Sequence, residues 1–218
     1  MKPILAIDGA LGGFSCAVLD GDRLEVRTLG AHSALEGGLG VVDAVLRACG
    51  LRPAGLAGIA VGLGPGSFTG LRIALSYAKA LALGAALPAC GISSYDLLEP
   101  EEAPLPALSV VVGRPGVICA RLRTADGHVA RKCGNVAEVI AAFEPARLGP
   151  LSVAGASDEL LADLRAAGAS ARPVAPRDPV AAVALVRMAR ERGFPDDPRA
   201  LRPDYGEAPA TTAPKKNA

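Results

Sequence analysis

The chain has 218 residues, of which half are hydrophobic, 3% are aromatic and none is tryptophan. This length allows one large domain or two small ones, with a core built mainly from Ala, Val, Leu and Ile. Basic and acidic residues are nearly balanced, at 23 and 22, so the composition gives no broad charged surface of the kind that binds nucleic acid or membranes.

The five cysteines are odd in number and widely spaced, and they are Cys16, Cys49, Cys90, Cys119 and Cys133. No two of them form a CxxC pair, so the sequence predicts neither a disulfide framework nor a zinc site. They are expected to be small buried residues in a reducing compartment. With no signal-peptide pattern at the N-terminus and no apolar run of membrane-spanning length, the chain is expected in the cytoplasm.

The first half of the chain reads as three strands, then helix, strand, helix, strand and a short helix. Short apolar runs bounded by turn residues predict the strands, and apolar segments of helical spacing that end at Gly predict the helices. Strands are expected at residues 3–8, 14–19, 24–29, 56–61 and 88–92, and helices at 39–49, 67–83 and from 93. An Asp-Gly turn at Gly21 makes the first three strands an antiparallel meander.

The composition shifts at residues 99–106 (EPEEAPLP), which are acidic and proline-rich, as is typical of a linker. Beyond them, strands are expected at 108–112, 117–123 and 151–154, and helices at 136–143, 158–167 and 179–192. The predicted division is a first lobe at 1–98, a smaller second α/β lobe at 107–195 and a flexible C-terminal tail at 196–218.

This order of elements predicts an α/β protein with the actin-like ATPase (RNase H-like) fold, in two lobes of which the second is abbreviated. A dinucleotide-binding fold would place a helix between the first strands, whereas here those strands form hairpins.

A glycine-rich turn at residues 62–67 joins a short strand to the longest helix, and Ser67 is placed to cap that helix. It is not a Walker A loop, because no Lys-Ser or Lys-Thr pair follows the glycines. The turn is interpreted either as a tight connection that needs glycine for close packing, or as an anion loop. The candidate anion-loop residues are Asp8, Gly9, Gly64, Gly66 and Ser67.

Asp8 ends the first strand, where actin-like ATPases carry an Asp-Gly turn that holds the metal and cradles phosphates. The alternative is a plain hairpin turn with a solvated carboxylate. The helix at 67–83 has almost no polar face, and a helix that is apolar all round is buried all round. In a chain of this length, that indicates burial by a second protein. Arg72 and Lys79 are expected either to reach solvent or to edge an interface.

The residue types needed for hydrolytic or metal chemistry do not assemble. Ser15 and Ser67 are conceivable nucleophiles, with His32 and His128 the two histidines. Ser67 does not lie in a GxSxG elbow, and no HxxxH or HExxH pair exists. No catalytic residue and no metal ligand is predicted.

Residues 64–73, GPGSFTGLRI, closely resemble the signature of the TsaB (YeaZ) family, the bacterial subunit for making threonylcarbamoyladenosine on tRNA. Further similarity lies in ILAID at 4–8, His32-Ser33 and GISS at 91–94, and the resemblance covers about residues 1–98. The chain departs from the family at Asp8-Gly9-Ala10, where Asp-Thr-Ser is usual. It also lacks the second-lobe Asp-Ala-Arg and Gly-Glu-Val-Tyr patterns, and residues 201–205 are only a loose echo of the terminal motif.

The resemblance implies an actin-like but non-catalytic subunit that stabilises the catalytic paralogue TsaD, in a heterodimer paired through first-lobe helices. The other implied partners are a TsaE-like ATPase and tRNA, which is bound only through the complex. The resemblance implies no membrane partner. Self-association is expected without the partner. No resident cofactor is implied, and ATP with magnesium at the complex interface is the alternative. The expected interface residues are Leu71, Arg72, Ile73, Leu75, Ala78, Lys79, Leu81, Ala82, Val42 and Val45.

Two rival functions remain. An actin-like nucleotide-binding enzyme would use Asp8 and the glycine loops, and it predicts magnesium-dependent ATP binding. A stand-alone protease is suggested by an older name for relatives of the family, and the missing catalytic triad argues against it.

Overall fold

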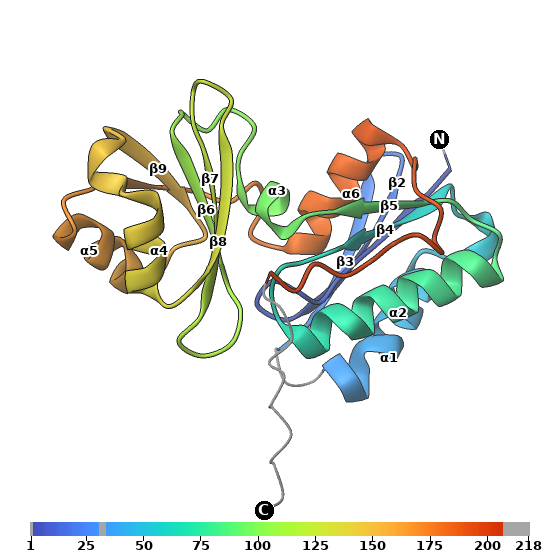
Figure 1. The fold of residues 1–218 in the computed structure, drawn as a ribbon. Helices are drawn as coiled ribbons and strands as arrows, with labels where there is room; N and C mark the ends of the chain where they lie inside the picture. The colour runs from blue at the N-terminus through green and yellow to red at the C-terminus, as the bar shows by residue number, and fades with distance from the viewer. Residues whose placement is uncertain (1, 31–33, 207–218) are drawn as a thin grey trace, which may run out of the picture.

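Two five-stranded mixed sheets with helices packed on them make up the part of the chain that the structure describes, residues 2–30 and 34–206 (Figure 1). The structure is a computed structural model. The strand order is β3-β2-β1-β4-β5 in the first sheet and β10-β9-β6-β7-β8 in the second. The predicted α/β class is therefore confirmed. No helix among the described residues is long and apolar enough to cross a membrane.

The first sheet combines an antiparallel meander with two parallel strands. Its strands are β1 (Ile4–Asp8), β2 (Phe14–Asp20), β3 (Arg23–Leu29), β4 (Gly58–Gly62) and β5 (Ala89–Ile92). One face is covered by the helices α1 (Ala34–Ala48) and α2 (Phe68–Gly84), and the other by α6 (Ala181–Arg192). Side chains alternate along each strand between these two apolar layers, so the central strands are buried on both faces.

The second sheet has the same plan on a smaller scale. Its strands are β6 (Ala107–Val112), β7 (Ile118–Arg123), β8 (Val129–Gly134), β9 (Pro150–Ala154) and β10 (Ser170–Val174). Helices α4 (Val136–Phe143) and α5 (Asp158–Ala166) cover one face. The short helix α3 (Ser94–Leu98) lies between the two sheets (Figure 1), and single 3-10 turns occur at Pro53–Gly55 and Pro145–Arg147.

Most of the predicted elements are present, and the differences have physical causes. The sequence did not predict strands β8 and β10, which lie at the two edges of their sheet. Apolar and polar residues alternate only weakly in them, because β8 carries exposed charged residues and β10 contains Pro173. Helix α1 begins at Ala34 rather than at residue 39, in spite of its glycines. Gly38 leaves room for the rings of Phe14 and Tyr77, because a Cβ there would lie 3.2 Å from the Tyr77 ring.

Two segments lie elsewhere than their sequence position suggested. Helix α6, which falls within the predicted second lobe at 107–195, packs on the first sheet, because its small buried side chains fit the apolar face of β1 and β2. Residues 196–206 are not a free tail: Asp196 pairs with Ala89 at the edge of β5, and Leu201 is buried. Residues 207–218 and His32-Ser33 lie outside the described residues. The boundaries of the two lobes stay a prediction.

Two further expectations are wrong. Cys119 and Cys133 form a disulfide, because the antiparallel register of β7 and β8 places these residues opposite each other with their Cα atoms 4.1 Å apart. A separation of 14 residues gave no sign of this pairing. The proline-rich segment at 99–106 is not a solvated linker throughout, because Glu99 and Ala103 are buried.

Candidate functional site

The glycine-rich turn at residues 62–67 packs directly against the loop that follows β1. The Ser67 amide donates to the Ala10 carbonyl oxygen at 3.0 Å. A Cβ on Gly66 would collide with that same oxygen, and a Cβ on Gly70 would collide with the carbonyl of Gly9. The Ser67 hydroxyl accepts from the Gly70 amide at 3.3 Å, which confirms its predicted capping role. The glycines therefore serve a close approach of two backbones.

Asp8 lies at the end of β1 and is completely buried, so it is not the solvated residue of a plain hairpin turn. Its Oδ2 accepts from the amides of Ala10 and Leu11, at 3.1 and 3.0 Å. Its Oδ1 has no hydrogen-bond partner among the described residues and faces Gly62, where a Cβ would collide with it. Burial raises the pKa of Asp8 to about 6, although the two amides act in the opposite direction.

Apolar side chains fill the junction between the β1 loop and the second sheet. Tyr95, Val111 and Cys119 are buried together there, and Leu11 packs against them from the loop that follows Asp8. Here the space beside the loop is occupied by protein.

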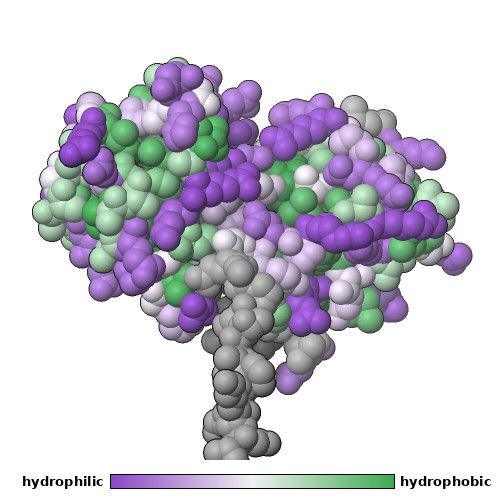
Figure 2. Space-filling model, in the orientation of Figure 1, coloured by the Kyte–Doolittle hydropathy of each residue, from purple (hydrophilic) through white to green (hydrophobic). Residues whose placement is uncertain are grey.

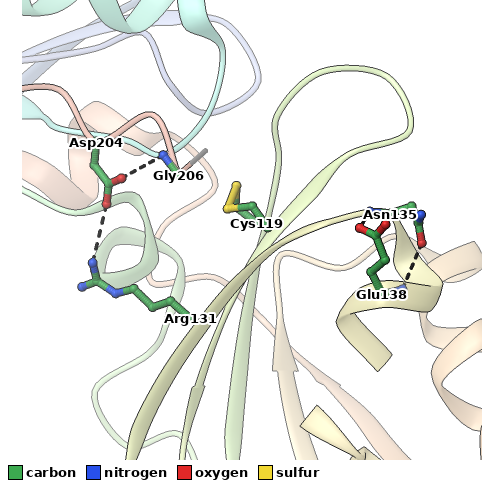
Figure 3. Close-up of a disulfide and its surroundings, with 7 residues drawn as sticks. Cys119, Arg131, Asn135, Glu138, Asp204 and Gly206 are labelled. Atoms are coloured by element: carbon green, nitrogen blue, oxygen red, sulfur yellow. Dashed lines mark hydrogen bonds and ion pairs between the residues drawn. A yellow bond between two sulfur atoms is a disulfide. The ribbon is translucent and has the colours of Figure 1, made fainter. Parts of the chain in front are cut away.

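The C-terminal segment at residues 204–206 covers the glycine-rich turn from outside. The Asp204 amide donates to the Leu63 carbonyl oxygen at 2.7 Å, and Gly206 lies against both sulfur atoms of the Cys119–Cys133 disulfide. Arg131 reaches from β8 to the Asp204 carboxylate, with 3.6 Å between Nη1 and Oδ2, beside the disulfide (Figure 3). This segment thus contacts both lobes. No sequence pattern predicted these contacts, because they join residues far apart in the chain.

Helix α2 is buried mainly by the chain itself, which corrects the inference of burial by a second protein. The fully buried members of the expected interface are Leu71, Leu75, Ala78, Ala82, Val42 and Val45. All of them except Leu71 belong to one apolar cluster with side chains of the first sheet. Ile73 and Leu81 are half-buried, and the Lys79 ammonium donates to the Leu201 carbonyl oxygen at 3.2 Å. Arg72 is the one member of the expected interface set that is exposed, and all members of that set lie within the described residues.

A different face of α2 is open to solvent. Phe68 is 57% exposed and Leu83 is 42% exposed, and Arg72 lies over the Phe68 ring at 5.2 Å. These three side chains follow helical spacing along one stripe, and Leu39 of α1 is equally exposed at 57%. We call these four residues the outer helix surface. Sequence reasoning missed three of them, although the spacing of residues 68, 72 and 83 could have indicated the stripe.

A groove of about 600 Å³ lies next to the outer helix surface. It runs along α1 and the turn that follows it, where Leu39, Leu46 and Leu51 are among its lining residues, and Leu81 of α2 contributes to it. Figure 2 shows hydrophobic and hydrophilic residues interspersed on the visible face of the molecule. The outer helices therefore offer separate apolar side chains beside a groove, with charged residues between them.

The candidate hydrolytic groups do not meet. The Ser15 hydroxyl accepts from the Ala182 amide at 3.2 Å, and Ser67 caps α2. His128 is exposed in the turn between β7 and β8. Among residues 2–30 and 34–206, no three His, Cys, Asp or Glu side chains are grouped as metal ligands.

Comparisons with known proteins point to one family. The model of the family "TsaD: tRNA N6-adenosine threonylcarbamoyltransferase" matches residues 32–138. The tRNA threonylcarbamoyladenosine biosynthesis protein TsaB of Haemophilus influenzae is 35% identical over 92 residues, which are 42% of this chain and 39% of that protein. TsaB of Escherichia coli is 38% identical over 97 residues, 42% of this chain and 40% of that protein. The matches thus span about two fifths of these relatives.

Solved structures agree on the fold over nearly the whole chain. A Pseudomonas aeruginosa protein similar to the peptidase YeaZ has a TM-score of 0.70 at 20% identity, with coverage of 95% of this chain and 100% of that one. A Bacteroides thetaiotaomicron protein with an actin-like ATPase fold has a TM-score of 0.56 at 10% identity, with coverage of 85% and 96%. These likenesses confirm the predicted actin-like architecture.

Proposed function

From the likeness to TsaB (YeaZ) proteins, we propose that this chain is a member of that family and serves the synthesis of threonylcarbamoyladenosine on tRNA as a non-catalytic partner subunit. In this role it stabilises a TsaD-like catalytic paralogue through α1 and α2. A TsaE-like ATPase joins the same assembly, and tRNA is engaged through the complex, in the cytoplasm. Without its partner, the chain self-associates through the same surface.

The observation that carries this proposal is the outer helix surface with its neighbouring groove. Large apolar side chains such as Phe68 and Leu83 remain exposed in the folded chain. The neighbouring groove is lined in part by leucines, as is typical of grooves that accept an amphipathic helix. Arg72, stacked on Phe68, adds the residue type that is enriched at interfaces. Burying each half-exposed side chain would contribute about 1 kcal/mol before the cost of association.

The filled junction beside Asp8 also supports a role in binding rather than in catalysis. Leu11, Tyr95 and Cys119 pack together beside the loop that follows Asp8, so apolar side chains rather than a polar cavity adjoin this loop. Ser15 and Ser67, the conceivable nucleophiles of a protease, are both engaged with backbone amides. Of the interface residues expected from sequence, the proposal keeps the exposed Arg72, and it takes Phe68, Leu83 and Leu39 in place of the buried members.

One observation favours the alternative function, an actin-like nucleotide-binding enzyme. The buried Oδ1 of Asp8 lacks a partner among the described residues, and a carboxylate oxygen is a ligand that magnesium accepts. This alternative predicts magnesium-dependent ATP binding by the isolated chain, measured by calorimetry. Our proposal predicts no heat of binding from the isolated chain, with any ATP held at the interface of the complex.

The test is the affinity of the purified chain for its TsaD-like paralogue. Leu83→Asp should weaken binding about tenfold or more, because it places a charge in the interface core. Val129→Asp is the matched control, since Val129 is 52% exposed on β8 of the second lobe. Both variants should keep the wild-type melting temperature. If Leu83→Asp binds as tightly as the wild type, the outer helix surface is not the interface.

A further inference from the structure

A charged cavity of about 210 Å³ lies where elements of both lobes meet, away from Asp8 and the glycine-rich turn. Asp96 belongs to α3, and Arg192 lies at the end of α6, which packs on the first sheet. Arg121 and Arg123 extend from β7 of the second sheet, and Arg177 precedes α6. A ligand in this cavity would therefore contact both halves of the molecule.

Two of the carboxylates that line the cavity, those of Glu99 and Asp96, are already paired with arginines of the chain itself. Glu99 is buried, and its Oε2 accepts from the Ser109 hydroxyl at 2.6 Å and from Arg121 Nη2 at 2.9 Å. Its Oε1 accepts from Arg123 Nε at 2.5 Å. The Asp96 carboxylate accepts from Arg121 Nη1 at 2.6 Å. A cation would therefore have to compete with these arginines for both carboxylates.

The arginines, in contrast, have donors to spare. A guanidinium carries five N–H groups, and the side chains of Arg177 and Arg192 are 25% and 48% exposed, so these two can donate to a ligand. Arg121 Nε also has no partner among the described residues, but it is itself buried. Arg192 approaches Asp96 only at 3.7 Å, and Arg177 meets Glu101, which is 80% exposed, only at 3.4 Å. Four guanidinium groups thus face three carboxylates, of which Glu101 is largely exposed to solvent.

We propose that this cavity is a binding site for a small oxyanion of the phosphate class. Guanidinium groups match the geometry and charge of phosphate oxygens, and a partly enclosed site strengthens such hydrogen bonds. The cavity is smaller than the roughly 300 Å³ at which sites for drug-sized ligands begin. It therefore holds the oxyanion itself rather than a whole nucleotide. Since its donors come from both lobes, the bound anion would hold the lobes together.

The test uses the full chain with inorganic phosphate as the probe and adenosine monophosphate as a second arm. Binding is measured by calorimetry, and thermal unfolding is compared with sodium chloride at equal ionic strength. Arg192→Gln is the test variant, because Arg192 is 48% exposed and its loss leaves Glu99 paired. Arg190→Gln is the matched control on the same helix, exposed and outside the cavity lining.

We expect phosphate to bind the wild type and Arg190→Gln equally, and Arg192→Gln at least tenfold more weakly. Phosphate should raise the melting temperature of the first two proteins above the sodium chloride control, and that of Arg192→Gln by less. Tighter binding of the mononucleotide than of phosphate would identify a nucleotide phosphoryl group as the source, and weaker binding would identify free phosphate. Absence of binding of both, or equal binding by the wild type and Arg192→Gln, would overturn the proposal.

Discussion

Replacing Asp8 with asparagine should stabilise the protein at neutral pH, although Asp8 lies at a position where related folds bind metal. The folded-state pKa of Asp8 is raised from 3.8 to about 6, because burial disfavours the charged carboxylate. A raised pKa means that the folded state binds the proton more tightly than the unfolded state does. The stability that this proton contributes is fully present below pH 3.8 and is lost as the pH rises through about 6.

The size of the effect follows from the shift in pKa. Because the pKa of Asp8 rises from 3.8 to about 6, ionised Asp8 lowers the free energy of unfolding at neutral pH by about 3 kcal/mol, at 1.36 kcal/mol for each pKa unit. Asparagine keeps the oxygen that accepts from the Ala10 and Leu11 amides. Its amide nitrogen would take the place of Oδ1, an atom that has no hydrogen-bond partner among the described residues. The neutral amide would therefore make the same contacts as a protonated Asp8 carboxyl. Asp8→Asn should therefore resemble the wild type at pH 4 and exceed its stability at pH 7.5 by up to about 3 kcal/mol.

Urea denaturation of both proteins at four pH values between 4 and 7.5 measures this difference. Asp22→Asn, in the exposed turn between β2 and β3, is the control and should leave the pH profile unchanged. A variant less stable than the wild type at pH 7.5 would refute the reasoning. It would mean that Asp8 Oδ1 has a partner that requires a carboxylate, such as a bound cation.

Three further predictions concern stability and are measured by urea denaturation. Leu75→Ala should lower the free energy of unfolding by about 2–5 kcal/mol, because Leu75 is part of the chain's own core. Leu83→Ala should change it by less than about 0.5 kcal/mol, because Leu83 is exposed. Glu99→Gln should cost about 3–5 kcal/mol, because it breaks a buried ion pair with two arginines. Reducing the Cys119–Cys133 disulfide, which closes a loop of 14 residues, should cost about 3 kcal/mol and lower the urea midpoint.

The parts of the fold that the sequence predicted are those encoded by local patterns. Buried strands such as β1 and β4 are short apolar runs with turn residues beside them, and the Asp-Gly turn at Gly21 fixed the meander. Ser67 was identified as a cap because capping depends on neighbours within three residues. The edge strands β8 and β10 were missed because an edge strand need not alternate or bury its side chains.

The candidate site was predicted less well because its contacts are distant in sequence. The apolar helix α2 could be assigned to burial, but the sequence did not reveal that the chain's own α1, sheet and C-terminal segment bury it. The contact of Lys79 with Leu201 spans 122 residues. The pairing of Cys119 with Cys133 and the burial of Glu99 likewise depend on how β7 lies in the sheet. A local pattern carries no information on such contacts.

The central claim, that this chain supports threonylcarbamoylation of tRNA by contact with a catalytic paralogue, is tested most directly in cells depleted of the protein. Mass spectrometry of their tRNA would measure the fraction of the adenosine that carries the threonylcarbamoyl group. We expect this fraction to fall on depletion and to be restored by the wild type and by Val129→Asp, but not by Leu83→Asp. An unchanged fraction after depletion, or full rescue by Leu83→Asp, would contradict the account.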